Sequence, residues 1–156
     1  VPYLGICLGM QIAVISFARY VANLKNANSG EFDADNQYKV IDFLPDQNDG
    51  VDKGGTLRLG AYPCSVKPDT KMYECYGSLS ISERHRHRYE FNNEFRDELA
   101  NAGLLISGTS PDERLVETVE VPGNKFYVGA QFHPEFKSRP NKPHPLFLGL
   151  IENSLK

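Results

Sequence analysis

The stretch Leu4-Gly-Ile-Cys-Leu-Gly-Met-Gln11 joins two different hydrophobic patterns. An apolar run from Val1 to Ile6 leads into Cys7, as expected of a short β-strand. Beyond the cysteine, apolar residues recur at the spacing of one helix face, at Met10, Val14, Phe17 and Val21. The stretch therefore predicts a strand, a sharp turn and a helix, with a thiol at the turn.

Gly5 and Gly9 flank the cysteine symmetrically, which gives the shape of a nucleophile elbow (G-x-S-x-G) with cysteine in place of serine. We expect glycine at both positions because a Cβ beside so tight a turn would clash. The start of the helix favours a thiolate at Cys7, and the backbone amide of Leu8 is positioned to help bind an oxyanion. The alternative interpretation is a buried cysteine packed between two glycines.

The composition is that of one ordinary globular domain. The chain has 156 residues, of which 40% are hydrophobic and 24% charged. A net charge of −3 gives no reason to expect nucleic acid or an anionic membrane as partner. We also expect no membrane-spanning segment and no secretory leader. The cysteines, Cys7, Cys64 and Cys75, are odd in number and lack metal-ligand spacing, so we expect a reducing, cytoplasmic setting and no metal site.

Apolar segments of both helical and strand type follow the elbow. The elbow helix is predicted to extend to about Lys25, and residues 45–55, rich in Asp, Asn and Gly, to form a surface loop. Residues 72–76 are apolar, but their pattern leaves the type of element open. Strands are predicted at 39–44, 62–66, 104–107, 115–121 and 126–132, and helices at 93–102 and 146–155.

The elbow strand stands almost at the first residue. A parallel α/β sheet usually has strands on both sides of such an elbow. We therefore expect the chain to be the C-terminal portion of a larger domain whose first strands precede Val1.

The segment Glu83-Arg-His-Arg-His-Arg-Tyr-Glu90 has the most unusual local composition. If it is a strand, its histidines share one face and its arginines the other. A nucleic-acid patch is one interpretation, but the basic residues are few in an acidic chain. A solvated strand is a second. The third is a local anion site, such as one for a substrate carboxylate, because guanidinium groups bind carboxylates through two hydrogen bonds.

His133 and Glu135 follow the apolar strand predicted at 126–132. In an extended segment, side chains two residues apart share a face, so the carboxylate can orient and polarise the imidazole. With Cys7 they would supply a nucleophile, a base and a group that orients the base. Taken separately, His133 could be a loop histidine and Glu135 an acid at a helix start.

These motifs resemble those of a known family. Gly-Ile-Cys7-Leu-Gly-Met-Gln11 together with Phe-His133-Pro-Glu135 is similar to the class I (triad-type) glutamine amidotransferases. Within that class the chain resembles the glutaminase domains of the CTP synthase family over nearly its whole length. The segments that carry the closer resemblance are 26–32, Gly54-Gly-Thr-Leu-Arg58-Leu-Gly60, Arg84-His-Arg-His-Arg88-Tyr-Glu-Phe-Asn92 and 131–140.

The resemblance implies an α/β fold of three layers, flavodoxin-like, with a mostly parallel sheet and helices on both faces, here without its N-terminal strands. It implies that glutamine is hydrolysed through a thioester and that the ammonia aminates UTP to CTP in an N-terminal synthetase domain. That domain would use ATP and magnesium, this one no cofactor. GTP would activate the enzyme and a homotetramer is implied. The implied residues are Cys7, His133 and Glu135 for catalysis, Leu8, Gln11, Glu31 and Arg88 for glutamine, and Arg58 for the GTP effect.

Members of the family carry a Gly-rich oxyanion loop upstream of the nucleophile, and this sequence begins after that point. Loss of one oxyanion donor typically lowers kcat by about 10²–10³, so we expect the loop to exist before Val1. Two other functions stay open from sequence. One is a non-catalytic regulatory or assembly module, and the other is a thiol hydrolase of γ-glutamyl peptides.

Overall fold

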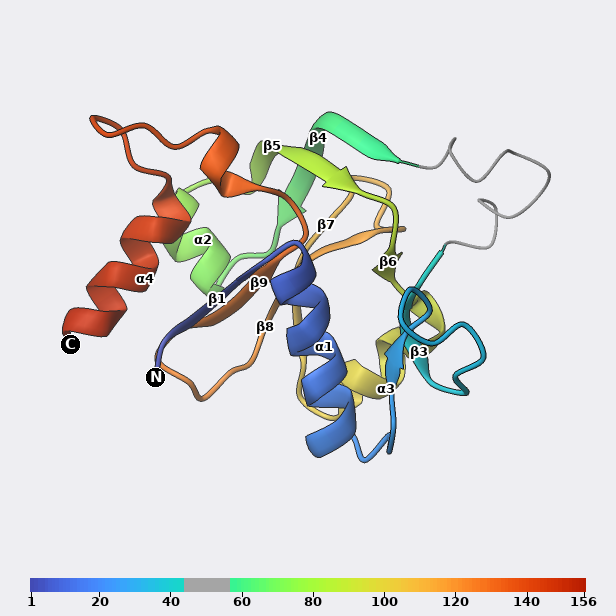
Figure 1. The fold of residues 1–156 in the computed structure, drawn as a ribbon. Coiled ribbons are helices and arrows are strands. Elements are labelled where there is room, and N and C mark those ends of the chain that lie inside the picture. The colour runs from blue at the N-terminus through green and yellow to red at the C-terminus, as the bar shows by residue number, and fades with distance from the viewer. Residues whose placement is uncertain (44–56) are drawn as a thin grey trace.

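The computed structural model describes residues 1–43 and 57–156. Its main sheet has six strands in the order β1-β9-β8-β7-β4-β5, and a second sheet has the order β2-β3-β6 (Figure 1). The predicted loop at 45–55 lies outside the described residues. The strands are β1 (Tyr3–Ile6), β2 (Asn28–Ser29), β3 (Lys39–Asp42), β4 (Arg58–Val66), β5 (Ser80–His87), β6 (Glu90–Phe91), β7 (Leu105–Thr109), β8 (Val116–Glu120) and β9 (Tyr127–Ala130); the helices are α1 (Leu8–Tyr20), α2 (Lys71–Tyr76), α3 (Arg96–Asn101) and α4 (Pro145–Leu155).

The α/β fold class is confirmed, with one correction to the expected strand directions. Among the described strands of the main sheet, β1 and β9 are parallel, whereas the pairs β9–β8, β8–β7, β7–β4 and β4–β5 are antiparallel. The reason is chain connectivity. Only residues 110–115 separate β7 from β8 and 121–126 separate β8 from β9, and such short links return the chain antiparallel. The sheet is therefore mixed rather than mostly parallel.

Helices cover both faces of the main sheet, giving the expected three layers (Figure 1). One hydrophobic core joins α1 and α3 to β7 and β8, and includes Met10, Leu99 and Val119. The other joins α2 and α4 to β9, and includes Met72 and Leu146. Successive β9 residues face opposite cores, as the alternation of a strand requires.

Several predicted elements differ at their ends. Helix α1 ends at Tyr20 rather than near Lys25, because the chain turns out of the helix through Asn23, whose φ is 59°. The ambiguous apolar segment is helix α2, capped by the Thr70 side chain and stopped by Gly77 in the left-handed conformation. The helix predicted at 93–102 is a 3₁₀ turn (Asn93–Phe95) followed by α3.

The predicted alternation in β5 is confirmed. His85 and His87 are buried, while Arg84 and Arg86 are exposed. Strand β5 stands at one end of the strand order and pairs with β4 alone among the described strands. Its second backbone edge is therefore available to the segments that follow β1 and β9.

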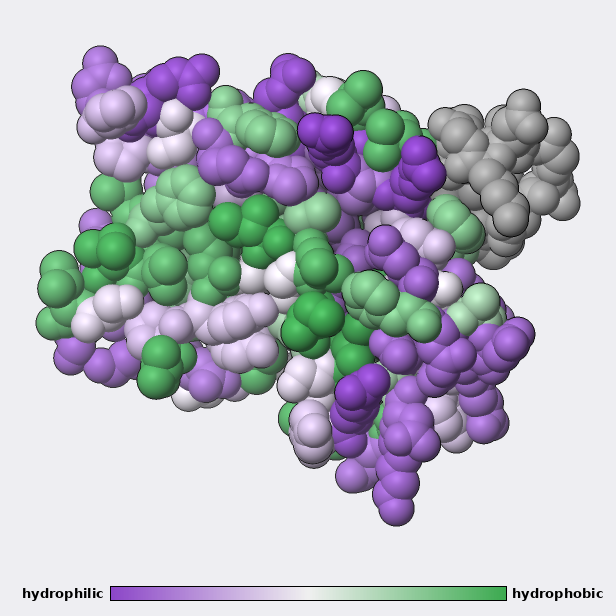
Figure 2. All heavy atoms as spheres, in the orientation of Figure 1, coloured by the Kyte–Doolittle hydropathy of each residue, from purple (hydrophilic) through white to green (hydrophobic). Residues whose placement is uncertain are grey.

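Hydrophobic residues gather over β1, α1 and α4 on the face drawn in Figure 2. Exposed hydrophobic side chains include Leu8 and Ile12 in α1 and Leu148 and Ile151 in α4. Within the described parts of the chain, no helix is long and apolar enough to cross a membrane.

The two glycines around the elbow are predicted to differ sharply in their tolerance of a side chain. A Cβ at Gly5 would lie 2.7 Å from the backbone carbon and oxygen of Gly9, whereas a Cβ at Gly9 would meet only the Tyr3 hydroxyl, at 3.7 Å. The sequence-based expectation of a clash is thus correct for Gly5 and wrong for Gly9. We expect Gly5→Ala to lower the free energy of unfolding of the full-length protein by about 3 kcal/mol.

The matched control is Gly9→Ala, which adds the same methyl group in the first turn of α1. It should leave the urea midpoint unchanged or raise stability by up to about 1 kcal/mol, because alanine favours helix. Equal losses in both variants would contradict the role assigned to Gly5.

Candidate active site

Cys7 occupies the corner between β1 and α1, and its backbone is strained. Its φ is 50° and its ψ −104°, which is rare for a residue with a side chain. The Cys7 amide donates to the carbonyl of Ala130 at 2.8 Å, and its carbonyl accepts the first helical hydrogen bond from the Gln11 amide at 3.2 Å. The strained corner directs the half-buried side chain away from both elements, as a nucleophile elbow does.

Two effects on the Cys7 thiol oppose each other. Burial raises the pKa of the thiol above its ordinary value, and the carboxylates of Glu135 and Glu31 add to the rise. The backbone N–H of Leu8 and the side chain of Gln131 lower the pKa by donating toward sulfur. Because the balance is upward, the thiol is protonated near neutral pH and needs a base before it can attack.

His133 and Glu135 form a close pair just beyond β9. The Nδ1 atom of His133 lies 2.5 Å from Oε1 of Glu135, and Nδ1–H donates to the carboxylate. In the neutral imidazole, Nε2 is then the nitrogen that can accept a proton. The backbone amide of His133 donates to the carbonyl of Arg84 in β5 at 2.9 Å, and Phe136 stacks on the imidazole. The pairing predicted from their spacing is present.

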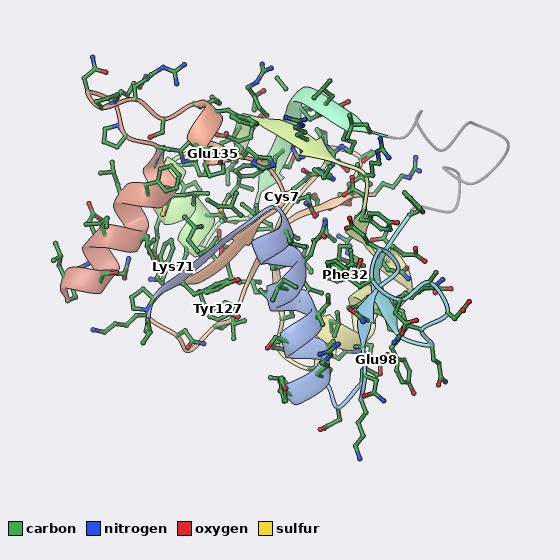
Figure 3. The ribbon with its side chains drawn as sticks, viewed as in Figure 1. Cys7, Phe32, Lys71, Glu98, Tyr127 and Glu135 are labelled. Carbon is green, nitrogen blue, oxygen red and sulfur yellow. The ribbon has the colours of Figure 1, made fainter. Side chains whose placement is uncertain are left out.

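The thiol and this pair stand at the same edge of the sheet. Because β1 and β9 are parallel, with Ile6 opposite Ala130, residues that follow the two strands emerge side by side. Figure 3 shows Cys7 at the junction of β1 and α1, with Glu135 at the same end of the sheet. Direct hydrogen bonding between Cys7 and His133 stays a prediction.

A cleft of about 970 Å³ opens beside the thiol. Five of the residues predicted from sequence line it: Cys7, Leu8, Gln11, Glu31 and Arg88. Carboxylates and cationic groups share its wall, which suits a ligand that carries both charges. The other lining residues are Gly30, Phe32, Ala34, Lys39, Asp42, Phe43, Leu57, Arg86, His87 and Tyr89.

Gln11 lines the cleft, but its side chain is hydrogen-bonded mainly to other protein atoms. It is buried, and its Nε2 atom lies 3.3 Å from the Tyr89 carbonyl and 3.2 Å from Oε1 of Gln131. Both donors of its carboxamide therefore bind protein atoms. Any contact with a ligand falls to its remaining atoms.

Arg58 lies outside the residues that line this cleft. Its guanidinium is buried, 2.7 Å from a Glu117 carboxylate oxygen and 3.1 Å from one of Glu90, and it lies over the ring of Tyr62. These internal hydrogen bonds give Arg58 a structural role. Its predicted link to an effector stays a prediction.

The pKa of the buried Glu90 carboxyl is strongly shifted. Burial raises its pKa to about 8, the Arg58 guanidinium works against the rise, and the Glu117 carboxylate adds to it. By contrast, burial and the neighbouring His85 and Arg58 lower the pKa of His87 to about 3. His87 is therefore neutral where it lines the cleft.

Sequence reasoning missed Gln131 and the buried partners of the β5 histidines. Gln131 is fully buried and its Nε2 atom lies 3.7 Å from the sulfur of Cys7. The signal in the sequence is a single carboxamide side chain inside the apolar run Phe126–Phe132, two residues before His133. In the described part of the chain, no group of three or more His, Cys, Asp or Glu side chains is placed to hold a metal ion.

Comparison with known proteins adds an independent observation. A family model described as "Glutamine amidotransferase class-I" matches residues 1–153. The chain is 62% identical to a CTP synthase of Carboxydothermus hydrogenoformans and 58% identical to one of Staphylococcus aureus, over 100% of its own length and 29% of theirs. The chain therefore spans less than a third of these relatives.

A solved structure gives the same picture. The fold matches a CTPS glutaminase domain of Trypanosoma brucei, whose structure holds bound acivicin, with a TM-score of 0.92 and 37% identity. The match covers 99% of this chain and 60% of that one.

Glu90 is predicted to make stability fall as the pH rises. Between its ordinary pKa of 4.5 and the folded value of about 8, the folded state binds a proton that the unfolded state releases. The titration of His87 has the opposite sign, fades as the pH rises past its ordinary pKa of 6.5, and cancels when the variant is compared with the unmodified protein. We expect Glu90→Gln to reduce the loss of unfolding free energy between pH 6.5 and 8 by about 1 kcal/mol.

Urea unfolding at several pH values measures this difference. Glu152→Gln, which changes an exposed carboxylate of α4, is the control and should behave as the unmodified protein does. An unchanged pH slope in Glu90→Gln would show that Glu90 is ionised in the folded protein throughout this range.

Proposed function

The chain belongs to the class I glutamine amidotransferase family, and from this premise we propose that it is the glutamine-hydrolysing domain of a CTP synthase. The observation that carries the proposal is the elbow thiol of Cys7 in a cleft that also presents Glu31 and Arg88. The identity of 58% to 62% with CTP synthases over the whole chain supports the more specific assignment.

The charges of the cleft fit the two ends of a free amino acid. Glu31 receives the α-ammonium group of glutamine, and Arg88 binds the α-carboxylate through its guanidinium. The side-chain carboxamide then points to Cys7. A γ-glutamyl peptide also carries these two charged groups, so the substrate class rests on a test rather than on charge alone.

The first half of the reaction forms a thioester. Nε2 of His133 takes the thiol proton of Cys7, and the thiolate attacks the amide carbon of glutamine. The backbone N–H of Leu8 stabilises the oxyanion. The imidazolium, whose charge the Glu135 carboxylate stabilises, gives its proton to the amide nitrogen; the C–N bond breaks and ammonia leaves.

The second half regenerates the thiol. His133 takes a proton from water, which attacks the thioester carbon. The C–S bond breaks, the imidazolium returns a proton to sulfur, and glutamate leaves. In the whole protein the ammonia passes to a synthetase domain that aminates UTP to CTP with ATP and magnesium, under activation by GTP, in a homotetramer.

Cys7→Ala is predicted to abolish glutamine hydrolysis by the full-length protein, because no nucleophile remains. CTP formation from added ammonia should persist at the unmodified rate, since ammonia bypasses this domain. Glutamate release and CTP formation measure the two reactions separately. Glutaminase activity retained by Cys7→Ala would contradict the assignment, and hydrolysis of γ-glutamyl peptides in preference to glutamine would identify the related thiol hydrolase.

A diazo-ketone analogue of glutamine is predicted to label Cys7 alone, as peptide mass spectrometry would show. Burial raises the pKa of Cys64 to about 12 and that of Cys75 to about 11, so both thiols are unreactive at neutral pH. A label on Cys64 or Cys75 would remove Cys7 as the nucleophile.

Arg88→Ala is predicted to raise KM for glutamine by at least about tenfold, because a charge-assisted contact is worth about 1.5–3 kcal/mol. The ammonia-dependent reaction of the same variant is the internal control and should be unchanged. An unaltered KM would show that the α-carboxylate binds elsewhere.

A further inference from the structure

Gln131 stands where β9 ends, against the nucleophile. Its side chain is 0% exposed, its backbone amide donates to the Glu117 carbonyl at 2.8 Å, and its Nε2 atom lies 3.7 Å from Sγ of Cys7. We propose that the Gln131 carboxamide donates a hydrogen bond to Cys7 and stabilises its thiolate, which makes it a further catalytic residue of the glutaminase reaction. The role in turnover rests on the proposed function; the hydrogen bond itself does not.

The direction of this hydrogen bond follows from a main-chain atom. The carbonyl oxygen of Tyr89 can only accept, so the Gln11 atom 3.3 Å from it is the amide nitrogen. The same nitrogen lies 3.2 Å from the Gln131 carboxamide and donates to its oxygen. The opposite end of that carboxamide, which faces sulfur, is therefore the NH₂ group.

The Tyr89 carbonyl is itself positioned by a hydrogen bond from a buried side chain. It accepts a second hydrogen bond from Nδ1 of His87, at 3.1 Å, and Nε2 of His87 lies 2.8 Å from Nδ1 of His85. The far nitrogen of His85 lies 3.0 Å from a Glu117 carboxylate oxygen. A series of hydrogen-bond contacts thus runs from His85 to the thiol.

The polar groups that contact the sulfur favour opposite protonation states. The Arg86 carbonyl, 4.0 Å away, accepts from the neutral thiol. The Gln131 NH₂ group is a donor and cannot accept a hydrogen bond from the thiol. It binds the thiolate more strongly than the thiol, because hydrogen bonds to charged groups are about twice as strong as neutral ones. In agreement, the Gln131 side chain lowers the pKa of Cys7 against the effect of burial.

The test is the pH dependence of alkylation of Cys7 by iodoacetamide in the full-length protein without glutamine. Only the thiolate reacts, so the midpoint of the rate profile reports the thiol pKa. Gln131→Glu keeps the oxygen that accepts from Gln11 and loses the amide donor. We expect the midpoint to rise by about one unit or more, which lowers the alkylation rate at pH 7 about tenfold.

Gln131→Met, of similar size but without either polar group, should raise the midpoint as well and guards against failure of the first variant to fold. Thr118→Ser alters a buried hydroxyl of the neighbouring strand β8, which contacts Ser107, and should leave the midpoint unchanged. Midpoints within about 0.3 units of the unmodified protein in both Gln131 variants would overturn the proposal. Because the experiment uses no glutamine, it tests the hydrogen bond even if the glutaminase assignment fails.

Discussion

The parallel pairing of β1 with β9 is the constraint on which the site depends. Four residues of each strand are in register, from Tyr3 opposite Tyr127 to Ile6 opposite Ala130, and the Cys7 amide extends the pairing by one hydrogen bond. Parallel strands end at the same edge of a sheet. A thiol near one end of the chain and an imidazole–carboxylate pair near the other are thereby brought to one edge, and no other described pair of main-sheet strands is parallel.

Strand β5 completes this edge from the other side. Its backbone carbonyls accept a hydrogen bond from the His133 amide and approach the Cys7 sulfur, while its buried His85 contacts Glu117 in β8. Edge strands usually leave such backbone groups unpaired. Here the exposed side chains of the strand face the solvent or the cleft, and the buried ones hold the strand in place. The unusual composition of residues 83–90 therefore reflects two different demands on alternate positions.

Local patterns predicted most of the elements and, within the cleft, Cys7 and the Leu8 amide. The elbow, the alternation in β5 and the His133–Glu135 spacing involve residues close in sequence, so periodicity is sufficient to detect them. Family resemblance identified Glu31 and Arg88. The strand directions and the contact of Gln131 with Cys7 depend on which distant segments become neighbours, which one sequence does not encode in any local pattern. Arg58 shows the converse limit, because its two buried carboxylate partners lie 32 and 59 positions away.

The backbone of Cys7 has a φ of 50°, a conformation that glycine adopts readily and residues with a Cβ avoid. Selection for reactivity therefore works against selection for folding at this one position. A lineage released from the need for the thiol would gain stability by replacing it with glycine. Among such proteins, inactive descendants are expected to carry glycine at this turn and to be more stable. A cysteine retained at this position would then indicate that its reactivity is still required.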